Sequence, residues 1–210
     1  CGLDSGSFGS CTSPVTYDGL GEGVHTFRVE AVDPAGNEST VTSYSWTIDL
    51  TQPPPPTITS APPSVAASTS ATFSFTDDEA SATFLCRLDN GSFDSCTSPV
   101  TYDQLSEGGH TFRVRAVDAA GNQSAATTYS WTVDVTPPPA PTITSAPASV
   151  TASTSATFAF TDGDSTATFS CKLDSGSFTS CTSPITYQQL AEGTHTFGVK
   201  GVDAAGHERA

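Results

Sequence analysis

Six cysteines stand in three pairs, and the two members of each pair are ten residues apart. The pairs are Cys1 with Cys11, Cys86 with Cys96, and Cys171 with Cys181. Thiols paired at a short, constant separation favour disulfides and an oxidising compartment. A zinc site would need four nitrogen or sulfur ligands with CxxC-type spacing, and a redox-active pair would need a close CxxC motif with basic neighbours. The sequence therefore predicts one structural disulfide per pair.

Each cysteine pair flanks a turn signal. Between Cys86 and Cys96 lies Asn90-Gly91, a dipeptide typical of β-hairpin turns. A three-residue turn centred on Gly91 would place Cys86 directly opposite Cys96. Closing such a short loop should stabilise the fold by about 2–3 kcal/mol.

The cysteine pairs recur with a period of 85 residues, and other residues keep the same register without gaps. Trp46 corresponds to Trp131, and the histidines and many aspartates align in the same way. The chain is therefore a tandem array. Proline-rich segments at 51–56 and 136–141 predict stiff linkers. We expect three units at 1–50, 51–135 and 136–210, of which the first lacks its first strands and the last lacks its final strand.

Each unit has one histidine at the start of its clearest alternating strand segment, on the apolar face of that segment. These histidines are His25, His110 and His195. No second histidine or cysteine stands at ligand spacing, so we expect packed structural histidines that donate to a nearby carbonyl. Trp46 and Trp131 are expected in the core. The sequence has no nucleophile-elbow pattern that would position a Ser-His-Asp triad. Three copies of the repeat would also mean three active sites in one chain. No catalytic residue is predicted, and the chain is not expected to be an enzyme.

Carboxylates gather near turns and linkers, where oxygen ligands could bind calcium. The candidates are Asp33, Asp49, Asp77, Asp78, Asp118 and Asp134. No Asp-x-Asp-x-Asp-Gly loop is present, and an aspartate before a turn often binds backbone amides instead. No cofactor is predicted other than this alternative of calcium.

Short alternating segments indicate about seven strands in the middle unit, among them 57–63, 71–77, 82–88, 98–102, 110–118 and 128–133. In the segment 110–118, His110, Phe112, Val114 and Ala116 share one face. This pattern predicts an all-β fold of tandem seven-stranded antiparallel sandwiches, with one hairpin disulfide per 85-residue repeat.

The segment 105–118, followed by Ala120-Gly121-Asn122, resembles the strand F region of fibronectin type III domains. The whole unit resembles the bacterial immunoglobulin-like repeats of large secreted and surface proteins. Gly206-His207 replaces Gly-Asn in the last copy. The position of the fibronectin tyrosine corner is occupied by histidine, His110 in the middle unit. The resemblance implies a fold and an extracellular setting rather than an activity.

The chain is strongly acidic, with a formal net charge of −15 and only seven lysines and arginines. This charge disfavours nucleic acid and anionic membrane surfaces as partners, and no apolar run is long enough to insert into a membrane. The sequence contains no methionine, so we expect it to be an interior piece of a longer precursor. The predicted location is extracellular or on the cell surface.

Three near-identical units favour a structural role: an extracellular stalk or fibre in which neighbouring repeats are each other's partners. One alternative is an adhesin-type module that binds glycan or protein. The other is a subunit of a filament in which copies of the chain share strands from head to tail.

Overall fold

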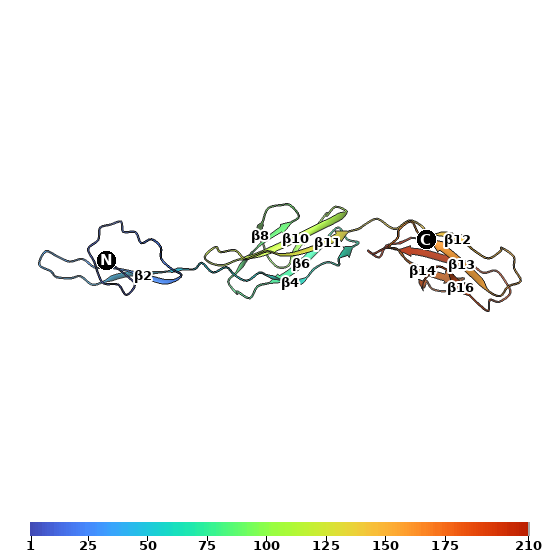
Figure 1. Cartoon of the computed structure of the whole chain (residues 1–210), viewed down its shortest axis with the longest axis horizontal. Helices are drawn as coiled ribbons and strands as arrows, with labels where there is room; N and C mark the ends of the chain where they lie inside the picture. Colours follow the sequence, from blue (N-terminus) through green and yellow to red (C-terminus); the bar gives the residue numbers. More distant parts are fainter. Residues whose placement is uncertain (210) are drawn as a thin grey trace.

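The computed structural model describes residues 1–209, in which every regular element is a β-strand. Ala210, the last residue of the expected third unit, lies outside the described residues. Three groups of strands follow one another along the long axis of the molecule, joined by extended segments (Figure 1). Across the described range no helix is long and apolar enough to cross a membrane.

The middle unit is a sandwich of two sheets. Its strands are β4 (Thr57–Ser60), β5 (Val65–Ala66), β6 (Ala71–Thr76), β7 (Thr83–Leu88), β8 (Asp94–Cys96), β9 (Val100–Tyr102), β10 (Gly108–Val117) and β11 (Thr127–Val133). One sheet has the order β5-β11-β10-β7-β8, and the other has the order β4-β6-β9. The predicted all-β sandwich is thereby confirmed.

The core lies between these two sheets because alternate residues of β6, β10 and β11 point inward. Phe112, Val114 and Ala116 of β10 are fully buried, as the alternation predicted. The ring of Phe73 on β6 stacks on that of Phe112, with centroids 4.2 Å apart, and meets Trp131 edge-on at 5.1 Å. Aromatic contacts across the two sheets therefore form the centre of the core.

The strand pattern differs from the prediction in two details. The middle unit has eight strands rather than about seven, and β5 runs parallel to β11 instead of antiparallel. Pro62 and Pro63 cannot donate to a ladder, so the chain leaves the β4 sheet there and joins the edge of the other. Thr132 N donates to Ser64 O (2.9 Å) and Asp134 N to Ala66 O (2.9 Å) at that edge.

The third unit repeats part of this architecture, without counterparts of β5 and β11 among the described residues. Its strands are β12 (Thr142–Ser145), β13 (Ala156–Thr161), β14 (Thr168–Leu173), β15 (Thr179–Cys181), β16 (Ile185–Tyr187), β17 (Phe197–Val202) and β18 (Glu208–Arg209). They form the sheets β12-β13-β16 and β15-β14-β17-β18. Phe158 stacks on Phe197 at 4.2 Å, which matches the Phe73–Phe112 pair.

The first unit consists, within the described residues, of one three-stranded sheet. Its strands are β1 (Gly2–Leu3), β2 (Gly23–Val29) and β3 (Thr42–Ile48), in the order β1-β2-β3. Phe27 and Trp46 are only half-buried, and Tyr44 is 69% exposed. Among the described residues no second sheet covers their face, whereas β4, β6 and β9 provide that cover in the middle unit.

The aromatic core generates a first prediction. Phe112→Ala should lower the free energy of unfolding of the middle unit by about 3–5 kcal/mol, since it removes a fully buried ring and leaves a cavity. Phe27→Ala, the same change on a half-exposed ring, should cost clearly less. Urea denaturation followed by tryptophan fluorescence measures both, because Trp46 and Trp131 report on the two units. Equal costs at the two positions would contradict the assignment of the core.

Candidate functional site

The cysteine hairpin is the most heavily cross-linked part of each unit. The structure joins Cys1 to Cys11, Cys86 to Cys96 and Cys171 to Cys181, with Cα–Cα distances of 5.8, 5.8 and 5.7 Å. In the middle unit the bond links β7 to β8, the edge strand of the five-stranded sheet. The disulfide therefore attaches a short edge strand covalently to its neighbour, in addition to the pairing of the two strands.

The predicted register of this hairpin is wrong. Cys96 lies opposite Phe84, and Cys86 lies opposite Asp94, so the two cysteines form a diagonal pair. The reason is the turn, which begins one residue earlier than Asn-Gly suggested. Asp89 has a left-handed φ of +50°, and Gly91 N donates to Leu88 O at 3.0 Å. Asp89, rather than Gly91, therefore reverses the chain.

The side chain of Asp89 ties this turn to the start of β10. Its Oδ1 accepts from Thr111 N (2.7 Å), and its Oδ2 lies 2.9 Å from His110 Nδ1. Asp4 with His25 and Asp174 with His195 make the same contacts at 2.9 and 2.8 Å. An aspartate tolerates left-handed φ better than most residues because its carboxylate can bind local amides. The sequence signal for this aspartate–histidine pair was a constant spacing of 21 residues, which sequence reasoning missed.

The histidine has acceptors on both ring nitrogens. His110 Nε2 donates to Ser106 O at 2.8 Å, and Nδ1 faces the Asp89 carboxylate. A neutral imidazole carries one N–H, so only the imidazolium donates to both acceptors. The bond to the Ser106 carbonyl, followed by the bond to Asp89, raises the pKa of His110 above its ordinary value, although burial opposes the shift. His110 lies in the core wall beside Trp131, with ring centroids 5.5 Å apart.

In each unit a phenylalanine of the cysteine hairpin lies close to one or two basic side chains. Arg87 and Arg115 place their guanidinium groups 4.7 and 3.8 Å from the ring centroid of Phe93. The equivalent rings Phe8 and Phe178 receive Arg28 in the first unit and Lys172 with Lys200 in the third. Five of the seven basic residues thus make cation–π contacts with the hairpin. Sequence reasoning did not predict this contact.

Two of the calcium candidates, Asp33 and Asp118, use both carboxylate oxygens to close a turn. Asp118 Oδ1 accepts from Ala120 N (2.9 Å) and Asn122 N (2.8 Å), and its Oδ2 accepts from Asn122 Nδ2 (2.8 Å). Although burial opposes it, these bonds lower the pKa of Asp118. Asp33 closes the same turn with Asn37. Both oxygens of each carboxylate are occupied, so these aspartates act as turn residues.

The other four candidates stand apart. Oδ1 of Asp49 and Oδ1 of Asp134 each accept one hydrogen bond from a backbone amide. The donor is the threonine at the start of the following linker, and the distances are 3.0 and 3.1 Å. Asp77 Oδ1 accepts from Glu79 N, while its Oδ2 is buried without a protein donor among the described residues. Asp78 is exposed. Of the six, only Asp134 joins a group of three metal-ligating side chains, together with Asp203 and His207, which were not among the candidates.

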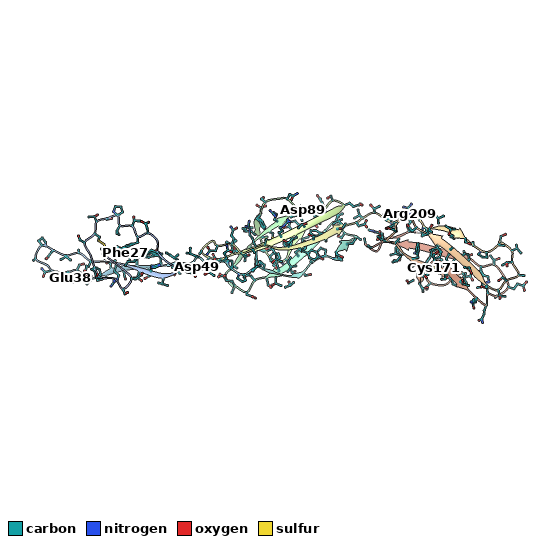
Figure 2. The ribbon with its side chains drawn as sticks, in the orientation of Figure 1. Phe27, Glu38, Asp49, Asp89, Cys171 and Arg209 are labelled. Carbon is teal, nitrogen blue, oxygen red and sulfur yellow. A yellow bond between two sulfur atoms is a disulfide. The ribbon has the colours of Figure 1, made fainter. Side chains whose placement is uncertain are left out.

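The start of each linker is hydrogen-bonded to the unit that precedes it. Thr51 Oγ1 donates to Glu22 (2.6 Å) in the preceding unit, and Asn122 Nδ2 of the following unit donates to Asp49 O (3.0 Å). Figure 2 shows Asp49 at the junction between the first and second groups of strands. Thr136 makes the same bond to Glu107 (2.8 Å) at the second linker. Both linkers are thus bound to the unit before them, and at the first junction a further hydrogen bond comes from the unit that follows.

One protein family matches the sequence of this chain. The profile of the bacterial Ig-like domain matches residues 18–50 and 57–135, more than half of the chain. The chain belongs to the bacterial Ig-like domain family. No curated protein matches it.

Solved structures similar to these Ig-like units include fibronectin type III modules. The chicken CNTN1 FN1–FN3 domains are 10% identical, with a TM-score of 0.42, over 87% of this chain and 73% of that one. The fibronectin(III)-like modules of Clostridium thermocellum CbhA are 20% identical, with a TM-score of 0.49, over 74% of this chain and 89% of that one. Similarity at this level carries no conclusion about function.

The hairpin disulfide generates a second prediction. Cys86→Ala combined with Cys96→Ala should lower the free energy of unfolding of the middle Ig-like unit by about 2–3 kcal/mol, because the unfolded chain regains the freedom of the open loop. Chemical denaturation measures the loss, and a reducing agent should bring the wild-type chain to a similar stability. An unchanged denaturation midpoint in both experiments would contradict a stabilising disulfide.

The raised pKa of His110 generates a third prediction. Since the folded-state pKa lies above the ordinary value of 6.5, the imidazolium contributes stability that is complete below pH 6.5 and is lost as the pH rises through the folded value. The stability advantage of the wild type over His110→Gln should therefore be largest in mild acid and shrink toward alkaline pH. Denaturation midpoints measured across this range test it. The cost of the double cysteine variant, which lacks a titrating group, should stay constant, and an advantage that grows with pH would contradict the charged pair.

Proposed function

We propose that the chain is a spacer segment of an extracellular or surface protein, which sets a distance rather than acting on a ligand. Family membership and three disulfides support the extracellular setting. Domains of the Ig-like and fibronectin type III-like kinds are typically non-enzymatic. The same unit recurs with the same disulfide. Repeating a unit lengthens a protein, whereas a binding or catalytic site needs to occur only once.

One observation carries this proposal: the hydrogen bond from Asn122 Nδ2 to Asp49 O, which crosses from one unit to the linker of the unit before it. A flexible tether needs no such bond. Together with the bond between Thr51 and Glu22, it fixes the start of a proline-rich linker that is already restricted in its backbone. A joint of this kind limits bending between neighbouring units, which is what a spacer requires.

The adhesin alternative has less support. Binding surfaces commonly expose aromatic side chains at their centre, whereas Phe73, Phe112 and Trp131 are buried in the core. Phe93 lies under two arginines. A filament in which copies of the chain share strands stays a prediction, which the mass of the assembly in solution would decide.

Small-angle X-ray scattering of the intact chain tests the spacer proposal. The wild type should give the profile of an extended particle with a narrow distribution of maximum dimensions. Asn122→Ala removes the bond to Asp49 and should broaden that distribution toward shorter values. Asn37→Ala is the matched control, because Asn37 closes the same turn in the first unit without bonding to a preceding linker. A wild-type profile as broad as that of Asn122→Ala would contradict a stiff spacer.

A further inference from the structure

The two junctions of the chain differ at one residue. In the first junction Asn122 Nδ2 donates both to Asp118 Oδ2 (2.8 Å) and to the Asp49 carbonyl (3.0 Å), so a single amide joins the turn to the linker. In the second junction the equivalent residue is His207. Across residues 1–209 no hydrogen bond joins His207 to Asp134, the counterpart of Asp49. The amide bridge of the first junction is therefore missing from the second.

The turn around His207 is otherwise the same. His207 N donates to Asp203 Oδ1 at 2.9 Å, Gly206 N donates to Asp203 O at 3.2 Å, and Asp203 N donates to His207 O at 3.2 Å. His207 Nδ1 lies 3.0 Å from Asp203 Oδ2, where the first junction has the Asn122 amide. The substitution thus places an imidazole nitrogen at the amide position without disturbing the backbone.

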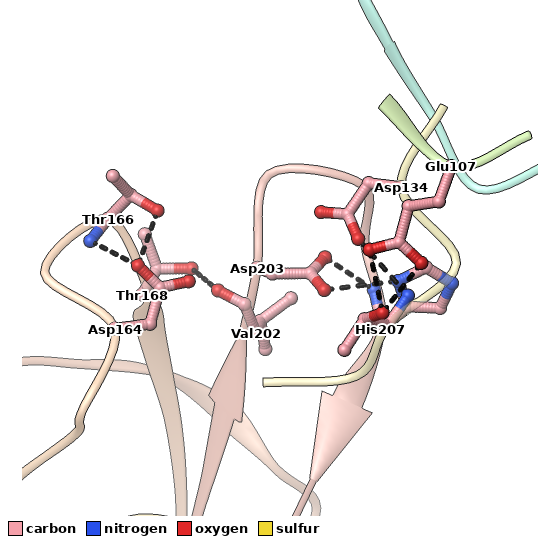
Figure 3. A network of polar contacts seen from close by, with 9 residues as sticks. Glu107, Asp134, Asp164, Thr166, Thr168, Val202, Asp203 and His207 are labelled. Carbon is pink, nitrogen blue, oxygen red and sulfur yellow. Dashed lines mark hydrogen bonds and ion pairs between the residues drawn. The ribbon is translucent and has the colours of Figure 1, made fainter. Parts of the chain in front are cut away.

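Three ligand groups converge at this junction. One atom each of Asp134, Asp203 and His207 lie within 4.8 Å of one another, and Figure 3 shows the three side chains directed at a common region beside Glu107. Asp203 is buried, with its side chain 4% exposed, and His207 is 21% exposed. Asp134 uses Oδ1 for Thr136 N, and its Oδ2 has no protein donor among the described residues. Two carboxylates and an imidazole therefore meet at a partly buried joint.

We propose that Asp134, Asp203 and His207 bind a divalent transition-metal ion of the zinc type, which bridges the second and third units where the Asn122 amide bridges the first and second. Binding at this site follows from its own geometry and does not depend on the spacer role.

The geometry suits such an ion. Zinc binds histidine nitrogen and carboxylate oxygen at about 2.0–2.2 Å in a tetrahedral arrangement. Neighbouring ligand atoms are then about 3.4 Å apart, close to the present 3.0 Å between Nδ1 and Oδ2. The ion would replace the proton between these two atoms and would bind Oδ2 of Asp134 as its third protein ligand. A water molecule would complete the coordination, as in other zinc sites with three protein ligands.

The ligand types select the metal. Calcium and magnesium take oxygen ligands almost exclusively, and calcium requires six to eight of them. Imidazole favours zinc and its neighbours in the transition series. The first junction, with an amide at this position, offers no such nitrogen. The proposal therefore concerns one junction, and it differs from a calcium site shared by every repeat.

Isothermal titration calorimetry of the intact chain with zinc chloride tests the proposal. The wild type should bind one zinc ion, and His207→Asn should weaken binding by more than about tenfold, since even outer-shell partners of a metal contribute that much. Asn is the residue at the same turn position in the other two units, so this variant keeps the fold. The ring signals of His207 should shift in NMR spectra on addition of zinc, and only four histidines need assignment.

Asn122→His provides the reciprocal test. This variant places an imidazole beside Asp49 and Asp118 and so recreates the same three ligand groups at the first junction. The number of bound zinc ions should therefore rise from one to two. Equal zinc affinity of the wild type and His207→Asn would overturn the proposal. Binding of calcium but not zinc at the second junction would also overturn the proposal. That result would mean that only oxygen atoms bind the ion there.

Discussion

The carboxylate of Asp89 connects the tip of the cysteine hairpin to the strand on which the core is built. One oxygen binds the backbone of Thr111, and the other binds the ring of His110, whose far nitrogen holds the loop before β10. The disulfide then secures the other end of the hairpin. A unit of about 85 residues buries limited apolar surface, so it depends on these local connections to hold its edge strand in place.

Charge in this chain has more than one structural use. The few basic residues lie mostly over Phe93 and its counterparts, where the arginine or lysine stems also cover apolar surface. Several aspartates bind the backbone amides of tight turns, as Asp118 does. The remaining carboxylates give the surface its strong negative charge, which produces electrostatic repulsion between copies of the chain. The acidic residues thus act locally as hydrogen-bond acceptors in turns and collectively as a source of electrostatic repulsion.

Each junction depends on the residue that follows the glycine of one turn. Asn122 reaches the linker with an amide that donates two hydrogen bonds. His207 keeps the turn and presents a ring nitrogen in place of the amide. Because the turn backbone is the same, the chemistry of the joint can change without any change in the fold. A repeat array can in this way vary its joints individually while its units stay alike.

The sequence by itself determined the period, most of the strands and the inward face of β10, because alternation and repetition are local properties of the chain. It also determined which cysteines pair, since ten residues around a turn leave few choices. Only the tertiary structure decided the hairpin register, because a left-handed Asp89 moved the turn by one residue. The approach of Asp89 to His110, and of Asp134 to His207, likewise brings together residues from separate strands or units. Their distances depend on how the strands and units pack, which residue spacing does not specify.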